Sequence, residues 1–275
     1  MINLNSSFNY FPGYQEGYKN NGSNNYKKGD GYHLKGEDKS LSKQYIENIT
    51  NKLVNSNGSF SKFYYITHIK QLSSILKKGI KPRNIVSSRQ YESVDISNSN
   101  VQQYRNYNIE LSMGTNTSLK NCVPLYFTPL HPMLYVRQDK INEIVVLSIS
   151  VDILKDKIEF AFSDKNAADS KVNFYNNLDL IENIDWNNIT GDYWNDKFYG
   201  PEFESWKEKR MAEFIIYPDV APIFIEDFLC ANIEVSKEIE LTIDQVVNEY
   251  PKFFNKNFKK DITITKDLIL EKKNP

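Results

Sequence analysis

The stretch "KRMAEFIIYPDVAPIFIEDF", residues 209 to 228, constrains the fold of this chain more than any other. Its apolar, β-branched and aromatic residues are typical of a buried strand, in which successive side chains point to opposite faces. Alternation puts Glu213 on the same face as Ile215, and Phe214 on the other face. Because an unpaired buried carboxylate is costly, Glu213 lies either on a wet face or edge, or in a cleft where it has a catalytic role.

The size and charge of the chain exclude several classes of protein. Its 275 residues, 40% of them hydrophobic, are enough for one large domain with a core. A net charge of -1 gives no overall positive field, so nucleic acid would have to bind in a local basic groove. The start of the chain lacks the pattern of a secretory signal, and the longest apolar runs are too short to span a bilayer. We therefore expect a cytoplasmic protein that does not bind a membrane.

The sequence offers little material for a metal site. Cys122 and Cys230 lie in strand-like segments and form neither a metal-ligand pattern nor a disulfide framework, which indicates core thiols in a reducing compartment. The three histidines, His33, His68 and His131, lie in unrelated contexts. We expect no bound metal.

The chain divides into an arm and a folded domain. Residues 1–58 are mostly polar, with no periodicity in the first part and a short helix predicted at 40–54. Residues 59–275 carry strand and helix patterns. Residues 63–67 resemble a strand, and the apolar spacing that follows predicts a helix ended by Gly79.

The remaining elements decide the fold class. We predict a helix from residue 178 to Gly191, and a capping-box pattern at 242–245 predicts the start of the last helix. Further strands are predicted within 123–135, 143–154, 210–218, 223–235 and 261–270. Strands outnumber strong helices and do not alternate with them regularly. We therefore predict an α+β fold with a mainly antiparallel or mixed central sheet and flanking helices.

Common catalytic motifs are absent, since the chain contains no GxGxxG, no Walker A loop, no HExxH and no GxSxG. Four features remain in order along the chain: His68 after an aromatic strand, Arg105 in "NVQQYRNYN", the block "VPLYFTPLHPMLY", and Glu213. This order resembles the DarT family of bacterial DNA ADP-ribosyltransferase toxins, from about Phe63 to Val235.

Five segments carry the resemblance. "YYITHIKQLSSILKKGI" is similar to the family's NAD-binding motif, and "NVQQYR" to the segment that ends in the catalytic arginine. "VPLYFTPLHPMLY" resembles a block of the same shape, and "FAFSDKNA" the strand end that leads into the substrate-recognition loop, here Ser163 to about Asn176. "KRMAEFIIY" is similar to the strand with the catalytic glutamate. Tyr65, Lys70 and Gln71 differ from the residues common in the family.

The resemblance implies an ADP-ribosyltransferase fold over 59–275, with NAD as co-substrate. The implied catalytic residues are Glu213 and Arg105. The implied NAD-binding residues are Thr67, His68, Gln71 and Tyr126. The implied substrate-binding residues are Met133, Tyr135, Asp164, Lys165 and Asn166.

The chemistry of ADP-ribosyl transfer suits these residue types. Cleavage of the nicotinamide–ribose bond passes through an oxocarbenium-like state, which a carboxylate such as Glu213 stabilises. Arg105 either stabilises the anion that develops on the accepting base or anchors the pyrophosphate, and Glu213 is also a candidate proton acceptor. A base inside a duplex cannot reach such a cleft, so single-stranded DNA is the expected substrate.

We therefore expect a toxin that transfers ADP-ribose from NAD to thymine or guanine in single-stranded DNA and releases nicotinamide. The family resemblance also implies an antitoxin partner that removes ADP-ribose, a macrodomain or a related hydrolase. Two alternatives stay open: the modification of RNA, and a module that binds NAD or nucleic acid without turnover. The presence of both Arg105 and Glu213 argues against the second alternative.

Overall fold

The structure is a computed structural model, and it describes residues 47, 51, 62–88, 105, 107–155, 158–190, 201–251 and 260–268. The predicted arm, with nearly all of its expected helix, lies outside these residues. The division of the chain at residues 58 and 59 therefore stays a prediction.

The described residues form ten strands, six α-helices and seven short 3₁₀ helices. The strands are β1 (Lys62–His68), β2 (Asn108–Glu110), β3 (Asn116–Ser118), β4 (Val123–Tyr126), β5 (Ile144–Ser150), β6 (Glu159–Asn166), β7 (Phe174–Tyr175), β8 (Ala212–Tyr217), β9 (Ile225–Cys230) and β10 (Asp261–Ile264). The α-helices are α3 (Leu72–Lys78), α4 (Arg83–Ser88), α6 (Pro132–Val136), α7 (Trp186–Thr190), α8 (Pro201–Arg210) and α9 (Ile233–Glu249). The 3₁₀ helices are η2 (Ile69–Gln71), η3 (Leu119–Asn121), η4 (Gln138–Glu143), η5 (Val151–Lys155), η6 (Leu178–Asn183), η7 (Pro222–Phe224) and η8 (Lys266–Leu268).

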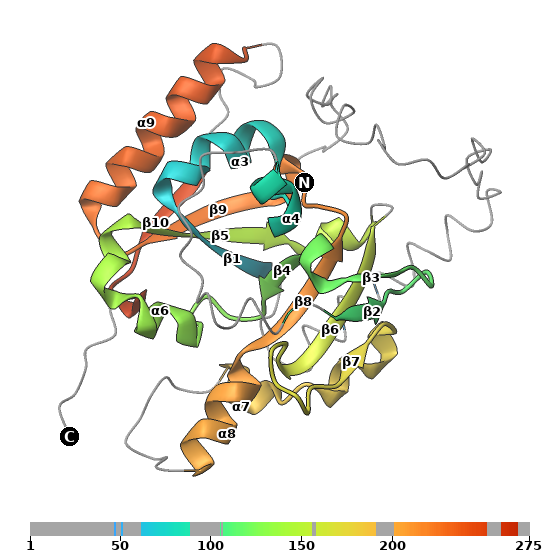
Figure 1. The fold of residues 1–275 in the computed structure, drawn as a ribbon. Helices are drawn as coiled ribbons and strands as arrows, with labels where there is room; N and C mark the ends of the chain where they lie inside the picture. Colours follow the sequence, from blue (N-terminus) through green and yellow to red (C-terminus); the bar gives the residue numbers. More distant parts are fainter. Residues whose placement is uncertain are drawn as a thin grey trace, which may run out of the picture.

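An eight-stranded sheet forms the centre of the fold, in the order β10-β9-β5-β1-β4-β8-β6-β7 (Figure 1). All neighbouring strands in it run antiparallel except β10 and β9, which are parallel. Strands β2 and β3 form a separate hairpin. The predicted α+β class with a mainly antiparallel sheet is confirmed.

The two halves of this sheet meet at a single residue pair. The pairing of β1 with β5 runs along the whole of β1, whereas β1 pairs with β4 only at Tyr64 and Tyr126. Tyr126 therefore sits at the junction of the half that ends in β10 and the half that ends in β7. Its register partner on the other side, in β8, is Glu213.

One face of the sheet carries the main hydrophobic core, which α3, α7 and α9 cover. Phe214 of β8 lies within this core, with its ring stacked at 4.4 Å on Phe63 and at 5.4 Å on Phe160. Truncation of a buried phenylalanine to alanine typically costs about 3–5 kcal/mol. This packing therefore fixes the strand that carries Glu213.

The opposite face carries two smaller hydrophobic clusters. Helix α6 and η4 cover one cluster, around Ile66 and Val146, and the β2–β3 hairpin covers the other, around Ile109 and Ile215. Glu213 has the same strand parity as Ile215, so its side chain points to this second face. The alternation predicted for the strand is confirmed, since Phe214 packs on the first face.

The helix predicted after β1 is confirmed, and it ends as expected at Gly79. This glycine has a φ of 79°, and a Cβ atom on it would lie 2.3 Å from the carbonyl oxygen of Val220. No other residue type fits there without a shift of the backbone.

Two predictions near the C-terminus are wrong. The last helix, α9, starts at Ile233, where the Asn232 side chain caps it by accepting from the N–H of Val235 at 3.0 Å. The capping-box pattern at 242–245 therefore lies inside the helix. The strand predicted at 223–235 ends at Cys230, because the apolar residues from Val235 onward follow the helical spacing of α9.

The region 178–190 forms η6 and α7 rather than one continuous helix. Helices α4 and α8 and the β2–β3 hairpin were not predicted. Cys122 and Cys230 are free and buried, as expected of core thiols. None of the helices in the described part of the chain is long and apolar enough to cross a membrane.

Candidate active site

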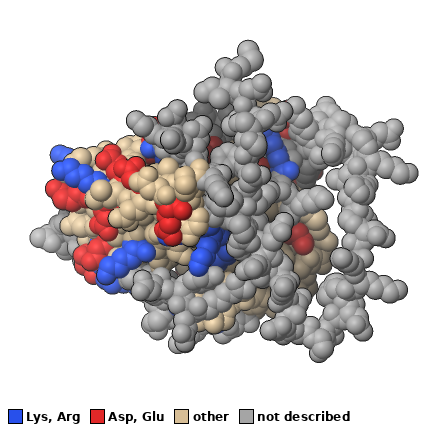
Figure 2. Space-filling view, turned by 90° about the horizontal axis from the view of Figure 1, so that it is seen from above, with Lys and Arg blue, Asp and Glu red and all other residues tan. Residues whose placement is uncertain are grey.

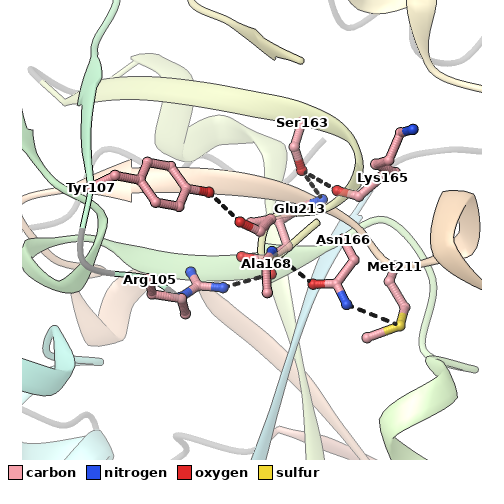
Figure 3. Close-up of polar contacts among 9 residues, drawn as sticks. Arg105, Tyr107, Ser163, Lys165, Asn166, Ala168, Met211 and Glu213 are labelled. Atoms are coloured by element: carbon pink, nitrogen blue, oxygen red, sulfur yellow. Dashed lines mark hydrogen bonds and ion pairs between the residues drawn. The ribbon is translucent and has the colours of Figure 1, made fainter. Parts of the chain in front are cut away.

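Glu213 and Arg105 form a buried ion pair (Figure 3). Arg105 Nη1 donates to Glu213 Oε1 at 2.7 Å, and the two side chains are 8% and 6% exposed. Burial by itself lowers the pKa of Arg105, but the Glu213 carboxylate outweighs this effect and the pKa is raised. The low exposure excludes the interpretation of Glu213 as a residue on a wet face or an edge.

The second carboxylate oxygen of Glu213 is buried and has no hydrogen-bond partner among the described residues. Buried polar atoms are nearly always paired, because an unmade hydrogen bond leaves the cost of desolvation uncompensated. Oε2 is therefore available to a donor that a ligand brings, such as a sugar hydroxyl.

A bulge in β6 lies opposite Glu213. β6 advances four residues, from Phe162 to Asn166, while its partner β8 advances two, from Phe214 to Ala212. Bulges of this kind often occur beside active sites, where they redirect side chains.

Ser163 lies in this bulge and links it to the catalytic strand. Its hydroxyl accepts from the backbone N–H of Glu213 at 3.0 Å and donates to the carbonyl of Lys165 at 2.7 Å (Figure 3). Ser163 is completely buried. It therefore fixes the backbone of Glu213 relative to the loop that follows β6.

Tyr107 lies close to the ion pair and was not predicted, although it stands two residues after Arg105. Its hydroxyl donates to the carbonyl oxygen of Ala167 (Figure 3). Burial raises the pKa of Tyr107 to about 12; Arg105 lowers this pKa and Glu213 raises it. Tyr107 is therefore a neutral donor that ties the Arg105 segment to the loop after β6.

Tyr126 lies beside Glu213 in the sheet, with its ring stacked on His131 at a centroid distance of 3.8 Å. Burial, and then the charge of Glu213, raise the pKa of Tyr126, so its hydroxyl stays protonated. His131 Nδ1 accepts from the N–H of Met133 at 3.1 Å. Burial and Arg210 lower the pKa of His131 to about 3, which keeps the imidazole neutral.

The predicted NAD-binding residues of the first motif lie together at the end of β1. Thr67 Oγ1 donates to Gln71 Oε1 at 3.2 Å. His68 Nδ1 accepts from the N–H of Lys70 at 3.1 Å, so Nε2 carries the proton and donates to Glu143 Oε2 at 3.0 Å. The backbone N–H of Lys70 is therefore occupied within the protein. Thr67, at the end of β1, and the two residues near it thus belong to the half of the sheet that does not contain β8.

Met133 and Tyr135 lie in α6, the helix that follows β4. Met133 packs against the cluster under this helix, together with Tyr126. Met133 therefore packs against the same cluster as Tyr126, which is the strand partner of Glu213.

Asp164, Lys165 and Asn166 belong to the bulge and the end of β6. Asp164 accepts from the backbone N–H of Asn173 at 3.0 Å and from its side chain at 2.7 Å, which closes the loop between β6 and β7. Asn166 Oδ1 accepts from the N–H of Ala168 at 3.0 Å. The fold thus brings the backbone of this segment opposite Glu213.

Several known proteins are similar to this chain in sequence. The family described as "ssDNA thymidine ADP-ribosyltransferase, DarT" matches residues 64–258. A DNA ADP-ribosyl transferase of Thermus aquaticus is 25% identical over 197 residues, which are 68% of this chain and 81% of that protein. A fusion of a DNA ADP-ribosyl transferase and a DNA ADP-ribosyl glycohydrolase from Thermosipho africanus is 28% identical over 218 residues, which are 77% of this chain and 53% of the fusion.

The fold is also similar to that of Thermus sp. 2.9 DarT. The structure of that protein with ADP-ribosylated ssDNA has a TM-score of 0.62 and 24% identity, over 77% of this chain and 97% of that chain. The same protein has been solved with NAD+, and that structure has a TM-score of 0.58. With the family match over most of its length, this chain belongs to the DarT family of ssDNA thymidine ADP-ribosyltransferases.

Proposed function

We propose that this DarT family member transfers ADP-ribose from NAD to a thymidine base in single-stranded DNA, and that Glu213 and Arg105 are its catalytic residues. The proposed catalytic roles rest on the hydrogen bonding of the two oxygens of the Glu213 carboxylate. One oxygen is held by Arg105, and the other is buried without a partner among the described residues. Of the two bases expected from the sequence, the family description supports thymine.

The first step breaks the bond between the nicotinamide nitrogen and ribose C1′. Nicotinamide leaves as a neutral ring with the bonding electron pair, and positive charge develops on the ribose. Glu213 Oε2 accepts a hydrogen bond from a ribose hydroxyl, and the carboxylate charge stabilises the oxocarbenium-like state. Because Arg105 and Ser163 already hold Glu213, little reorganisation is needed during the reaction.

The second step joins C1′ to the base. In thymidine N1 carries the sugar, so N3 is the one ring nitrogen that bears a hydrogen. N3 must lose this proton as it bonds to C1′, and Glu213 or water accepts it. Arg105 stabilises the negative charge that develops on the thymine ring.

Both substrates must reach the second face of the sheet. We propose that Thr67, His68, Gln71 and Tyr126 bind NAD, and that Met133, Tyr135 and the segment Asp164–Asn166 contact the DNA. Figure 2 views the molecule from the side of α3 and α9, where the described Lys, Arg, Asp and Glu side chains are intermixed.

We further propose that the protein is a cytoplasmic toxin, because NAD and DNA are found together in that compartment. The Thermosipho relative joins its transferase to a DNA ADP-ribosyl glycohydrolase in one chain. This arrangement supports an ADP-ribose-removing antitoxin, for example a macrodomain protein, as the partner of this chain.

The test is to incubate the protein with NAD and single-stranded oligonucleotides that contain one thymine, cytosine, guanine or adenine, and to measure their intact mass. We expect one added ADP-ribose, confined to the thymine oligonucleotide and absent with Glu213→Gln. Modification of a matched RNA instead would favour the RNA alternative. No nicotinamide release with any nucleic acid would favour a binding module.

A further inference from the structure

A cavity of about 320 Å³ lies on the second face, at the edge of the β2–β3 hairpin. Its walls come from the hairpin and from the segment around β7: Tyr107, Asn108, Ile109, Glu110, Phe174 and Asn176. Ligand pockets in proteins typically span roughly 300–1,000 Å³, so this cavity suits a single ring system and not a dinucleotide.

The cavity shares a wall with the active site. Tyr107 lines it, stands two residues from Arg105, and donates its hydroxyl to Ala167 in the loop that follows β6. Phe174 and Asn176, which also line the cavity, lie at the far end of the same loop. A group bound here therefore lies next to the acceptor side of the site.

The lining suits a nucleobase. The rings of Tyr107 and Phe174 meet edge-on at a centroid distance of 5.7 Å, and aromatic rings of this kind provide stacking surface for a base. Asn108 and Glu110 are exposed at the rim, where they can reach the polar edge of a bound ring. A carboxylate is an acceptor only, and it pairs with the exocyclic amino groups that cytosine, adenine and guanine carry and thymine lacks.

We propose that this cavity binds the base next to the target thymidine, and that Glu110 selects a base with an exocyclic amino group (cytosine, adenine or guanine) over thymine at that position. The inference rests on the proposed function and adds a determinant of sequence context to it. The adenine of NAD is not the proposed occupant, because Thr67, His68 and Gln71 lie in the other half of the sheet.

The experiment uses the full chain, NAD and single-stranded oligonucleotides with one target thymidine. This thymidine is flanked on each side in turn by cytosine, adenine, guanine, an abasic site or N3-methylthymine, which has no exocyclic amino group and no N3 hydrogen to lose. The wild type should transfer ADP-ribose roughly tenfold faster when cytosine, adenine or guanine, rather than N3-methylthymine, occupies one flanking position. Glu110→Gln should lose this preference and keep its rate on the oligonucleotide flanked by N3-methylthymine.

Two further variants complete the test. Phe174→Leu should lower kcat/KM roughly tenfold for every flanking base and leave the abasic oligonucleotide unaffected, because stacking is lost. Glu240→Gln removes an exposed carboxylate on α9, on the far side of the sheet, and should behave like the wild type.

The outcomes separate this inference from the proposed function. The cavity does not recognise a neighbouring base if the wild type modifies thymidine equally with every flanking base, or if Glu110→Gln keeps the preference. In either case only this inference fails, and the proposed function stands. A higher KM for NAD in Glu110→Gln, with unchanged flanking preference, would assign the cavity to the NAD adenine. Absence of transfer to every oligonucleotide would overturn the proposed function itself.

Discussion

The backbone N–H of Glu213 donates to the side-chain hydroxyl of Ser163, 3.0 Å away. The proposed catalytic residue is thereby tied to the bulge from which the proposed substrate loop departs. The position of the carboxylate and the conformation of the loop therefore depend on one buried hydroxyl.

Replacement of Ser163 by alanine should lower both stability and catalysis. The N–H of Glu213 would lose its acceptor in a buried site, which costs about 1–3 kcal/mol. Urea denaturation measures this loss, and steady-state kinetics should show a fall in kcat larger than any rise in the KM for NAD. Ser236→Ala, at a buried serine of α9, is the matched control and should leave kcat unchanged. Equal effects of the two substitutions on kcat would contradict a positioning role for Ser163.

Replacement of Glu213 by glutamine should reduce ADP-ribosyl transfer by roughly 10²-fold or more, because a neutral amide cannot stabilise the positive charge on the ribose. Glu213→Asp keeps the charge but withdraws it from Arg105 and the ribose, so we expect intermediate activity. Oligonucleotide mass after timed incubation measures both variants, and NAD binding by calorimetry shows whether the site still forms. Wild-type activity in Glu213→Gln would contradict a catalytic role for Glu213.

Replacement of Arg105 by glutamine should destabilise the fold by about 3–5 kcal/mol, because it leaves a buried carboxylate without its cation. The double variant Arg105→Gln with Glu213→Gln should recover much of this loss, since neither charge remains. Denaturant unfolding of the wild type, the single variants and the double variant gives the coupling energy directly. A coupling energy near zero would show that Arg105 and Glu213 do not form a stabilising ion pair in solution.

His131 should make the stability of the protein depend on pH. Its pKa in the folded state, about 3, is lowered from the ordinary value of 6.5, so the unfolded chain binds a proton that the folded chain does not. The stabilisation is therefore complete above about pH 6.5 and falls as the pH drops toward 3, by up to about 1.4 kcal/mol per pH unit.

His131→Asn tests this dependence, because asparagine can still accept from the N–H of Met133 but does not titrate. We expect lower overall stability, since the stack on Tyr126 is lost, and a flatter slope of unfolding free energy between pH 4 and 6. Parallel slopes for the wild type and the variant would assign the acid sensitivity to other groups.

Replacement of Gln71 by alanine should raise the KM for NAD several-fold with little change in kcat, if Gln71 and Thr67 bind the co-substrate as proposed. The change removes the acceptor of the Thr67 hydroxyl at the end of β1. Lys70→Ala, at the exposed neighbouring position, controls for a change of charge and shape in η2. A fall in kcat without a change in KM would place Gln71 in the chemical step instead.

Local patterns determined part of this structure. Alternation over 211–217 predicted both the strand and the face of Glu213, and the change of period after His68 predicted the helix that Gly79 ends. These features follow from short-range geometry, because side-chain periodicity and the positive φ of a glycine depend on a few neighbouring residues. The order of five segments was also sufficient to predict the family that the match over 64–258 confirms.

The chemical state of the candidate site was decided by the tertiary structure alone. Arg105 and Glu213 are 108 residues apart in sequence, and neither periodicity nor spacing shows that they pair in a buried site. The bulge of β6 and the stack of Tyr126 on His131 were likewise missed. Each depends on which strands and helices become neighbours, and that choice is made by packing the whole core, to which residues from distant parts of the chain contribute together.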